Sequence, residues 1–460
     1  MFSLKRRLRR LWPRKRRPLD PVTRLKKEGP LALSVADAVA VARGRSPDEL
    51  RAMFAGDPWL TNYVVNLWEY ATRQTHLTTY PWKVVIPMSD VCNATCTFCN
   101  SWLRGVQVLK PDDVRRFKDV LRYAVQLGLE GHGEPLVNPH FEEVVNEFSK
   151  IVDPRCRKYM ITNAARLDRH FDLVQRLNVN TFSISLNAAT PATHHEVMGL
   201  GPDAFERIVA SLRRLIAARD ARGDMAVHIT MVVLNQNVQE VARFIELGNE
   251  LNVDSVWLRT LLPTQDPRGS GLEGLNYHTL PAYLNPDFEE ARAEAVAAIA
   301  ASRVPVVAEP DSWSVPTFPE AVAERIRLDP PRLISKDEAK ARHKVDLSAY
   351  HDEQSRHWRG RKTGAALSDA EIYGTENPFD RSPGYGCIDV YSVLHLNDFL
   401  YVLRPCCYME NPPGYEFIHY DGSYPFFEAW NSPAMVEIRR TLRDGPLLTW
   451  CKRCPSQPQH

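Results

Sequence analysis

Three cysteines lie close together in the first quarter of the chain, in the spacing C-x3-C-x2-C. They are Cys92, Cys96 and Cys99, and Phe98 directly precedes the last of them. Most [4Fe–4S] clusters are bound by four cysteine thiolates. A set of three would bind three irons of such a cluster and leave the fourth iron open to another ligand. Zinc is the alternative, but zinc sites usually combine two cysteine or histidine pairs at a distance, so the triplet favours a cluster.

The triplet, with an aromatic residue before its third cysteine, resembles the signature of radical S-adenosylmethionine (radical SAM) enzymes. The resemblance implies a [4Fe–4S] cluster whose open iron binds the amino and carboxylate groups of SAM. It also implies a flavodoxin- or ferredoxin-type electron donor and a 5′-deoxyadenosyl radical that removes a substrate hydrogen. The cofactor supplies such chemistry, while the protein supplies position and excludes water. Phe98 is assigned to the cofactor site on the same resemblance.

A second motif, G-H-G-E-P, follows the cysteines by about 35 residues. It resembles the Gly-Gly-Glu motif of the same family and gives Gly131, Gly133 and Glu134 as cofactor-binding candidates. The resemblance implies that Glu134 meets the SAM amino group, which is physically reasonable for a carboxylate and a cation. Glycines let backbone approach a ligand closely. On its own, the same sequence would be an ordinary tight turn.

Further polar residues stand at the ends of two expected strands. Thr162 and Asn163 end one of them and are cofactor-binding candidates. In the family, polar groups at the end of the fourth strand reach the ribose or carboxylate of SAM. The resemblance therefore gives Ser185 and Asn187 as candidates, and capping of the strand end is their alternative role.

From residue 81 to about 310, short apolar segments alternate with amphipathic ones, which is typical of parallel βαβ units. We expect a helix over 111–127 and a second strand that ends at the G-H-G-E-P motif. The fold class predicted is α/β, an open (β/α)6 partial TIM barrel, whose catalytic groups lie at the carboxyl ends of the strands. The other strands are expected at 83–87, 158–163, 181–187, 226–234 and 255–261.

The last 75 residues contain a second set of cysteines and a Trp430-Asn431 pair. They resemble the auxiliary-cluster domain called SPASM, or its shorter twitch form. Two features depart from that pattern: Tyr401 replaces the usual hairpin glycine, and there are five cysteines rather than seven. The resemblance implies one auxiliary [4Fe–4S] cluster, with a structural zinc as the alternative. The expected ligands are Cys387, Cys406, Cys451 and Cys454, with Cys407 in place of Cys406 as a second register.

In the first register Cys407 is not needed as a ligand. A substrate radical either loses an electron, for which a nearby cluster is a natural acceptor, or regains a hydrogen atom, for which a thiol is a natural donor. We expect the first fate, because neighbouring side chains on an extended segment point to opposite faces. Cys407 remains a candidate hydrogen donor, and a small buried residue beside the cluster is its alternative role.

Composition favours a globular protein of two or three domains: the chain has 460 residues, 44% of them hydrophobic and 25% charged. Eight of its nine cysteines belong to the two groups above, and the ninth, Cys156, is given no chemistry. This usage points to a reducing, cytoplasmic location. No apolar run reaches the roughly 18 residues of a membrane span. The expected parts are a basic arm (1–17), a helical lead-in (18–80), the barrel (81–310), a polar insert or lid with a helix near 318–328 (311–386) and the cluster domain (387–460).

The charge is concentrated at the start of the chain. Residues 5–17 carry nine Lys or Arg, and taking these from the net charge of +2 leaves −7 for the rest. Such an arm could make weak contacts with an anionic surface, or it could be a solvated tail. It is no signal peptide, because no apolar region follows it.

The sequence thus predicts a radical SAM oxidoreductase that dehydrogenates a polar small molecule, such as an aminocyclitol or a sugar. One alternative is a peptide-modifying radical SAM enzyme that epimerises or cross-links its substrate. A second alternative is an iron–sulfur electron carrier that makes no radical, and a third is an interaction protein with zinc in its tail. The G-H-G-E-P motif speaks against the carrier, which needs no site for the SAM amine.

Overall fold

The computed structural model describes residues 19–99, 107–131, 133–259, 261, 282, 285–308, 387–397, 402–404 and 420–445. Its centre is a nine-stranded sheet in the order β7-β6-β5-β4-β3-β2-β1-β8-β9. Neighbouring strands are parallel from β7 to β8, and the β8–β9 pair is antiparallel. The strands are β1 Lys83–Pro87, β2 Gln126–Glu130, β3 Arg157–Thr162, β4 Val179–Ser185, β5 Ala226–Val232, β6 Ser255–Arg259, β7 Val306–Ala308, β8 Val393–Asn397 and β9 Val402–Arg404.

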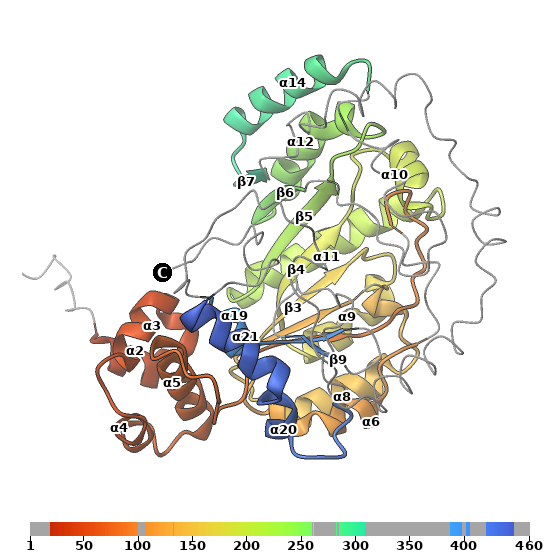
Figure 1. Ribbon diagram of the computed structural model, residues 1–460. Helices are drawn as coiled ribbons and strands as arrows, with labels where there is room; N and C mark the ends of the chain where they lie inside the picture. The colour runs from red at the N-terminus through yellow and green to blue at the C-terminus, as the bar shows by residue number, and fades with distance from the viewer. Residues whose placement is uncertain are drawn as a thin grey trace, which may run out of the picture.

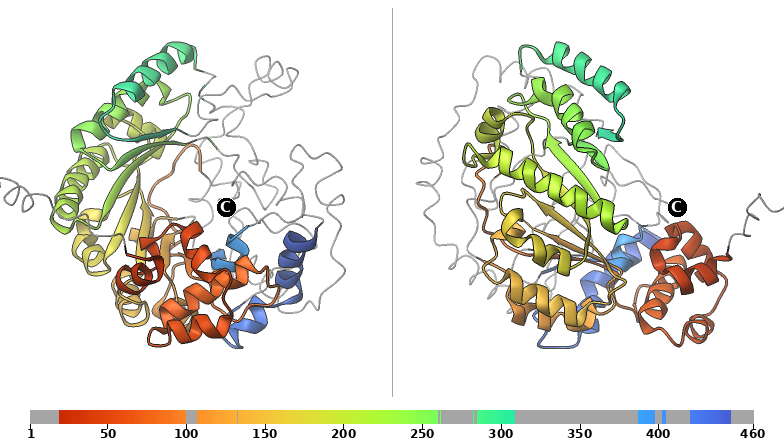
Figure 2. Two further views of the ribbon diagram at one scale, coloured as in Figure 1. Left: turned by 90° about the vertical axis from the view of Figure 1, so that its left-hand side faces the viewer. Right: turned by 180° about the vertical axis from the view of Figure 1, so that it is seen from behind.

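Helices cover one face of this sheet (Figures 1 and 2). The helix α8, for example, is amphipathic and buries Phe141, Val144, Val145 and Phe148 along one stripe. The predicted open barrel of βα units is therefore confirmed. The helices that follow β1 to β6 are α6 Pro111–Arg116, α7 Lys118–Leu121, α8 Phe141–Ile151, α9 Leu167–Arg176, α10 Pro191–Met198, α11 Ala204–Arg222, α12 Val241–Leu251 and α14 Phe288–Ala301, with short 3-10 turns at Pro135–Val137 and Val238–Glu240.

The long helix predicted over 111–127 is wrong in its extent. The segment forms two short helices, α6 and α7, separated by Phe117, and it leaves helical structure after Leu121. The end of the predicted range instead enters β2, which pairs in register with β1 from Gln126 onward. Leu127 is buried in the sheet beside β1, and this burial outweighs the local preference for helix.

Gly248 on α12 shows which strand residues face the helices, and therefore which residues lie on the opposite face of the sheet. A Cβ on Gly248 would overlap the side chain of Val256, and Ile229 Cδ1 would lie 3.5 Å away. Ile229 and Val256 therefore point toward the helices. Since side chains alternate along a strand, their neighbours His228 and Trp257 lie on the opposite face, which we call the inner face.

The region before the barrel is helical, as predicted. Its helices are α2 Pro21–Glu28, α3 Val35–Ala42, α4 Pro47–Met53 and α5 Pro58–Ala71, with a 3-10 turn at Pro30–Ala32. The sequence Ser-Pro-Asp-Glu at 46–49 is typical of a helix start, and Ser46 and Glu49 indeed form a reciprocal capping box at the start of α4. The apolar stripe of α5 is core, with Tyr63 and Leu67 fully buried. No helix among the described residues is long and apolar enough to span a bilayer.

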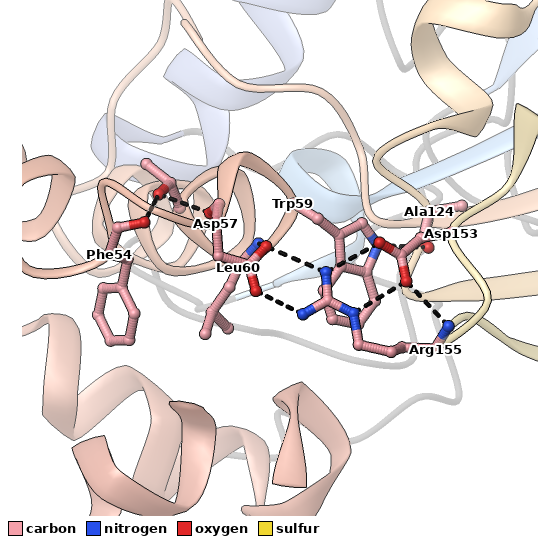
Figure 3. A network of polar contacts seen from close by, with 8 residues as sticks. Phe54, Asp57, Trp59, Leu60, Ala124, Asp153 and Arg155 are labelled. Atoms are coloured by element: carbon pink, nitrogen blue, oxygen red, sulfur yellow. Dashed lines mark hydrogen bonds and ion pairs between the residues drawn. The ribbon is translucent and has the colours of Figure 1, made fainter. Parts of the chain in front are cut away.

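Arg155, in the loop before β3, connects the helical region to the barrel (Figure 3). Its guanidinium donates to Asp57 at the start of α5 and to Asp153 in its own loop, and it lies 4.3 Å from the centre of the Trp59 ring. The Trp59 indole N–H donates to the carbonyl of Ala124 at 2.9 Å. These hydrogen bonds lower the pKa of Asp57 and raise that of Arg155. The contact is partly exposed, so it fixes an orientation more than it adds stability.

The C-terminal part packs on the same helices and extends the sheet. β8 pairs with β1 in parallel, and Asn66 of α5 donates to the carbonyl of Tyr391 at 2.8 Å. Asn431 makes two hydrogen bonds of 2.8 Å with the backbone of Leu77. The predicted hairpin is present as β8 and β9. The helices here are α19 Asp389–Ser392, α20 Phe426–Trp430 and α21 Pro433–Asp444 (Figure 1).

Candidate functional site

The three predicted cysteines lie in the loop that follows β1, and the base of this loop is closed by backbone pairing. Asp90 N–H donates to Gln107 at 2.9 Å, and Leu109 N–H donates to Met88 at 3.1 Å. The buried amide of Asn138 donates to the carbonyls of both Met88 and Leu109, at 2.9 and 2.8 Å. The loop therefore starts and ends at fixed points beside the sheet.

The middle of the cysteine loop rests on the end of α10. The backbone N–H groups of Thr95 and Thr97 donate to the carbonyls of Met198 and Val197, both at 2.9 Å. The Cys96 sulfur lies 3.5 Å from the Met198 sulfur. The position of Cys96 is thus set by a helix that follows β4, about a hundred residues later in the chain.

The chemistry of the three thiols fits the proposed cluster. None of the three forms a disulfide and all are half-buried, whereas Cys156 is buried. Burial, together with the charges of Glu134 and Cys99, raises the pKa of the Cys92 thiol to about 11. Cysteine binds metal as the thiolate, so binding of the metal must offset the cost of deprotonating Cys92. Within the described ranges, no group of three or more His, Cys, Asp or Glu side chains is placed to hold a single metal ion.

The motif at the end of β2 packs against the cysteine loop. Gly133 N–H donates to Ser89 and Glu134 N–H donates to Val91, both at 2.9 Å. A Cβ at Gly133 would overlap those same carbonyl oxygens, so glycine is required for this contact. Closeness to SAM was the expected reason for this glycine; the structure shows closeness to the cysteine loop. Gly131 lies beside Pro87 of β1, and His132 is outside the described residues.

Glu134 is 2% exposed, and three protein groups donate to its carboxylate. The Thr162 hydroxyl and the Leu136 N–H donate to Oε1 at 2.5 and 3.1 Å, and the Asn163 N–H donates to Oε2 at 2.7 Å. Burial raises the pKa of Glu134, and these hydrogen bonds oppose that rise. A carboxylate has about four acceptor positions, so one more donor can still bind.

Asn163, at the end of β3, reaches across to the cysteine loop. Its side-chain nitrogen lies 2.9 Å from Asn93 Oδ1 and 4.0 Å from the Cys92 sulfur. Its side-chain oxygen accepts from Ala165 N–H at 3.0 Å. The ends of β1, β2 and β3 are therefore joined through Cys92, Glu134 and Asn163.

The two candidates after β4 differ. Asn187 is buried at φ 58°, and its side chain accepts from Val232 N–H at 2.8 Å and donates to the Met198 sulfur at 3.1 Å. Its polar groups thus stabilise the backbone at the end of the strand, which is the capping role considered as its alternative. Ser185 is half-buried and opposite Thr230 in the sheet, and its hydroxyl has no partner among the residues described here.

The inner face carries polar side chains that the sequence reading did not assign to the site. On β5 and β6, His228 Nδ1 and Trp257 Nε1 each lie 2.7 Å from the Ser255 hydroxyl. The Arg259 guanidinium lies 4.5 Å from the centre of the Trp257 ring. On β2 and β3, Tyr159 lies over Gly128 and meets Glu130 at 3.3 Å. The alternation of polar and apolar residues along these strands could have identified these inner-face residues from the sequence.

Of the remaining candidates, Phe98 packs beside the small buried cluster of Val197, Leu234 and Leu261. Cys387 is half-buried next to α19. Burial raises the pKa values of Tyr70 and Tyr391, and the nearby charge of Cys387 contributes to both. The other predicted tail ligands, together with the basic arm and the 311–386 insert, are outside the described residues: Cys406, Cys407, Cys451 and Cys454.

Comparison with known proteins agrees with this geometry. Residues 86–248 match the family described as "Radical SAM superfamily". This range begins in β1, contains the cysteine loop and ends in α12. The match to the radical SAM superfamily therefore covers the part of the chain that runs from β1 to α12.

Several curated proteins match over the same region. The chain is 26% identical over 199 residues to the AdoMet-dependent heme synthase of Methanosarcina barkeri, which covers 41% of this chain and 53% of that protein. It is 27% identical over 189 residues to the probable GTP 3′,8-cyclase of Saccharolobus islandicus, covering 39% and 56%. The chain thus spans about half the length of the curated relatives it matches.

Solved structures also match over much of the chain. SuiB of Streptococcus suis shares 14% identity at a TM-score of 0.47, over 83% of this chain and 72% of that one. The enzyme anSMEcpe, in a structure titled with bound AdoMet and the Cp18Cys peptide, shares 14% identity at a TM-score of 0.42, over 77% and 81%.

Proposed function

We propose that this chain is a radical SAM enzyme whose cluster is held by Cys92, Cys96 and Cys99. The observation that carries the proposal is the location of the triplet. It lies within the superfamily match, on a loop after β1 that contacts the loops after β2 and β3 and the end of α10. When bound, the cluster would supply the electron that splits SAM. The chain's own residues hold the loop in place.

SAM would lie at the carboxyl ends of the strands, beside the open iron. Glu134 is the candidate partner of the SAM ammonium, because its carboxylate can accept one more hydrogen bond beyond the three it has. Ser185 is the candidate for the ribose or carboxylate, since its hydroxyl lies on the inner face. Thr162, Asn163 and Asn187 would contribute by fixing the loop.

The substrate would be held on the inner face, where the polar groups of β4 to β6 lie. Two substrate classes follow from the sequence: a polar small molecule to be dehydrogenated, and a peptide to be modified. The solved structures above include one titled with a peptide, and SuiB is also known in a structure titled with its precursor peptide SuiA. These titles agree with the peptide alternative. A likeness at TM-scores below 0.5 does not select a substrate, so the assay must contain both classes.

We further propose one auxiliary [4Fe–4S] cluster, bound by Cys387 with Cys406, Cys451 and Cys454. The proposal is supported by the cysteine pattern and by Asn431 of the Trp-Asn pair, which is held in place by two hydrogen bonds to the backbone of Leu77. The cysteine usage also supports our assignment of the chain to the cytoplasm.

Metal analysis and SAM cleavage test these proposals together. Two clusters give about eight irons per chain, whereas a zinc-containing interaction protein would give about one zinc. Anaerobically reconstituted protein should release 5′-deoxyadenosine from SAM under dithionite. A protein with full iron content that releases none would be the electron carrier instead.

A further inference from the structure

We propose that Asn163 is a positioning residue for the SAM-cleaving cluster, and that its side-chain amide raises the reduction potential of the cluster by facing the Cys92 sulfur. The inference rests on the proposed function, since it takes the cluster to be bound by the triplet. It changes the role of Asn163 from a SAM contact to a contact of the cluster's own ligand.

The amide group of Asn163 has a fixed orientation. Its oxygen accepts the Ala165 N–H at 3.0 Å, and the backbone N–H of Asn163 is held by Glu134 at 2.7 Å. The side chain is buried, at 5% exposure. Its NH2 group is therefore directed away from Ala165 and toward the cysteine loop.

The NH2 group of Asn163 has two hydrogen-bond acceptors in the cysteine loop. Asn93 Oδ1 takes one at 2.9 Å, and the Cys92 sulfur lies 4.0 Å from the same nitrogen. An amide nitrogen has two hydrogens, so this pair of contacts uses both. SAM would then find no donor left on Asn163.

The electrostatic consequence has a definite sign. Reduction of a cluster adds negative charge, part of which resides on the thiolate ligands. Hydrogen bonds to the sulfurs and the solvent exposure of the cluster set its potential. At 4.0 Å the amide acts as a dipole with its positive end toward Cys92, in a buried setting where such fields are little screened. It therefore favours the reduced state.

The contact between Asn163 and Asn93 offers a matched pair of variants, Asn163→Asp and Asn93→Asp. Asn163→Asp keeps the acceptor for Ala165 but removes both N–H donors, and the Asn93 amide can rotate to donate to the new carboxylate. Asn93→Asp adds the same charge close by, yet the amide of Asn163 can still donate to the new carboxylate and to the Cys92 sulfur. Comparison of the two separates the lost donor from the added charge.

The experiment is a potentiometric titration of anaerobically reconstituted full-length protein, monitored by electron paramagnetic resonance. The signal to follow is the one that changes when SAM is added, which distinguishes the triplet cluster from any tail cluster. Asn163→Asp should lower the potential relative to Asn93→Asp by a tenfold shift of the one-electron equilibrium, about 59 mV. Asn163→Ser, whose hydroxyl is too short to reach Cys92, should lower the potential relative to wild type without adding charge.

Equal potentials for Asn163→Asp and Asn93→Asp, with Asn163→Ser at the wild-type value, would overturn the inference. Weaker SAM binding by calorimetry in Asn163→Ser, at an unchanged potential, would also overturn it and return Asn163 to the SAM site. A wild-type protein that binds no iron at the triplet would instead reject the proposed function, which the iron content reveals before any titration.

Discussion

The Thr162 hydroxyl donates to the Glu134 carboxylate at 2.5 Å, joining the loop after β2 to the end of β3. Both residues are buried, and the backbone N–H of Glu134 also holds the cysteine loop at Val91. A single carboxylate thus connects the predicted SAM site with the loop that carries the cluster ligands. This connection makes Glu134 the first residue to test.

Replacement of Glu134 by Ala should weaken SAM binding by about ten- to a hundred-fold and should lower stability. Each hydrogen bond to a charged group contributes about 1.5–3 kcal/mol, and the buried donors would be left unpaired. Calorimetry with SAM and chemical unfolding measure the two effects. Glu143→Ala, on the exposed side of α8, is the control. Unchanged SAM affinity would remove Glu134 from the site.

His194 on α10 should make the protein sensitive to acid. Its ring is fully buried without a hydrogen-bond partner among the described residues, and burial lowers its pKa to about 4. Glu206 opposes this lowering slightly, and His195 adds to it.

Since the fold favours neutral His194, its contribution to stability is complete above the unfolded pKa of about 6.5 and is lost as the pH falls toward 4. The loss expected from this shift is about 3 kcal/mol. Urea unfolding at several pH values should show a steeper loss for wild type than for His194→Leu. The exposed His76→Leu variant should follow wild type. Parallel profiles for wild type and His194→Leu would refute the assignment.

Arg439 on α21 should be a main stabilising contact of the C-terminal part. Its buried guanidinium donates to the carbonyls of Val390 and Thr75, both at 3.1 Å, and lies 4.9 Å from the centre of the Trp430 ring. Burial lowers its pKa to about 10.

Arg439→Met should reduce the free energy of unfolding by about 1–3 kcal/mol, because the buried carbonyls of Val390 and Thr75 lose their hydrogen-bond donor. The neighbouring Arg440 pairs with Glu437 at the surface, so Arg440→Met should cost less than about 1 kcal/mol. Denaturant titration compares the two, and equal costs would show that the buried contacts contribute little.

The fold was predictable where the pattern is local and repeated. The strands after residue 81 and the start of α4 at Ser46 follow from alternation and capping residues alone. The end of the helix predicted over 111–127 was not predictable, because pairing of Gln126 with Lys83 decides it. Sequence patterns along one segment contain no information about such distant partners.

The site was predictable in its residue types and less so in their roles. The cysteine triplet was predicted from its spacing and Glu134 from the resemblance of its motif to the radical SAM family, and the structure brings Glu134, Asn163 and Cys92 together. The hydrogen bonds of the Asn187 side chain to Val232 and Met198 could not be predicted, since they depend on a buried network between separate loops. The roles of all five tail cysteines, Cys387 included, remain predictions.

Cys407 distinguishes two outcomes of the reaction once a substrate is known. We predict that Cys407→Ala keeps its turnover in heavy water and that the product contains no solvent deuterium, because the substrate radical is oxidised through the auxiliary cluster. Mass spectrometry of the product measures both. Lost turnover in the variant, with deuterium at carbon in the wild-type product, would make Cys407 the hydrogen donor of an epimerase.

The central claim is that Cys92, Cys96 and Cys99 hold a cluster that cleaves SAM. The most direct measurement is the yield of 5′-deoxyadenosine from SAM and dithionite, by wild type and by Cys96→Ala, with Cys156→Ala as the control for a cysteine outside the loop. We predict release by wild type and Cys156→Ala and none by Cys96→Ala, which should retain the iron of the tail cluster. Cleavage by Cys96→Ala at the wild-type rate would contradict the account.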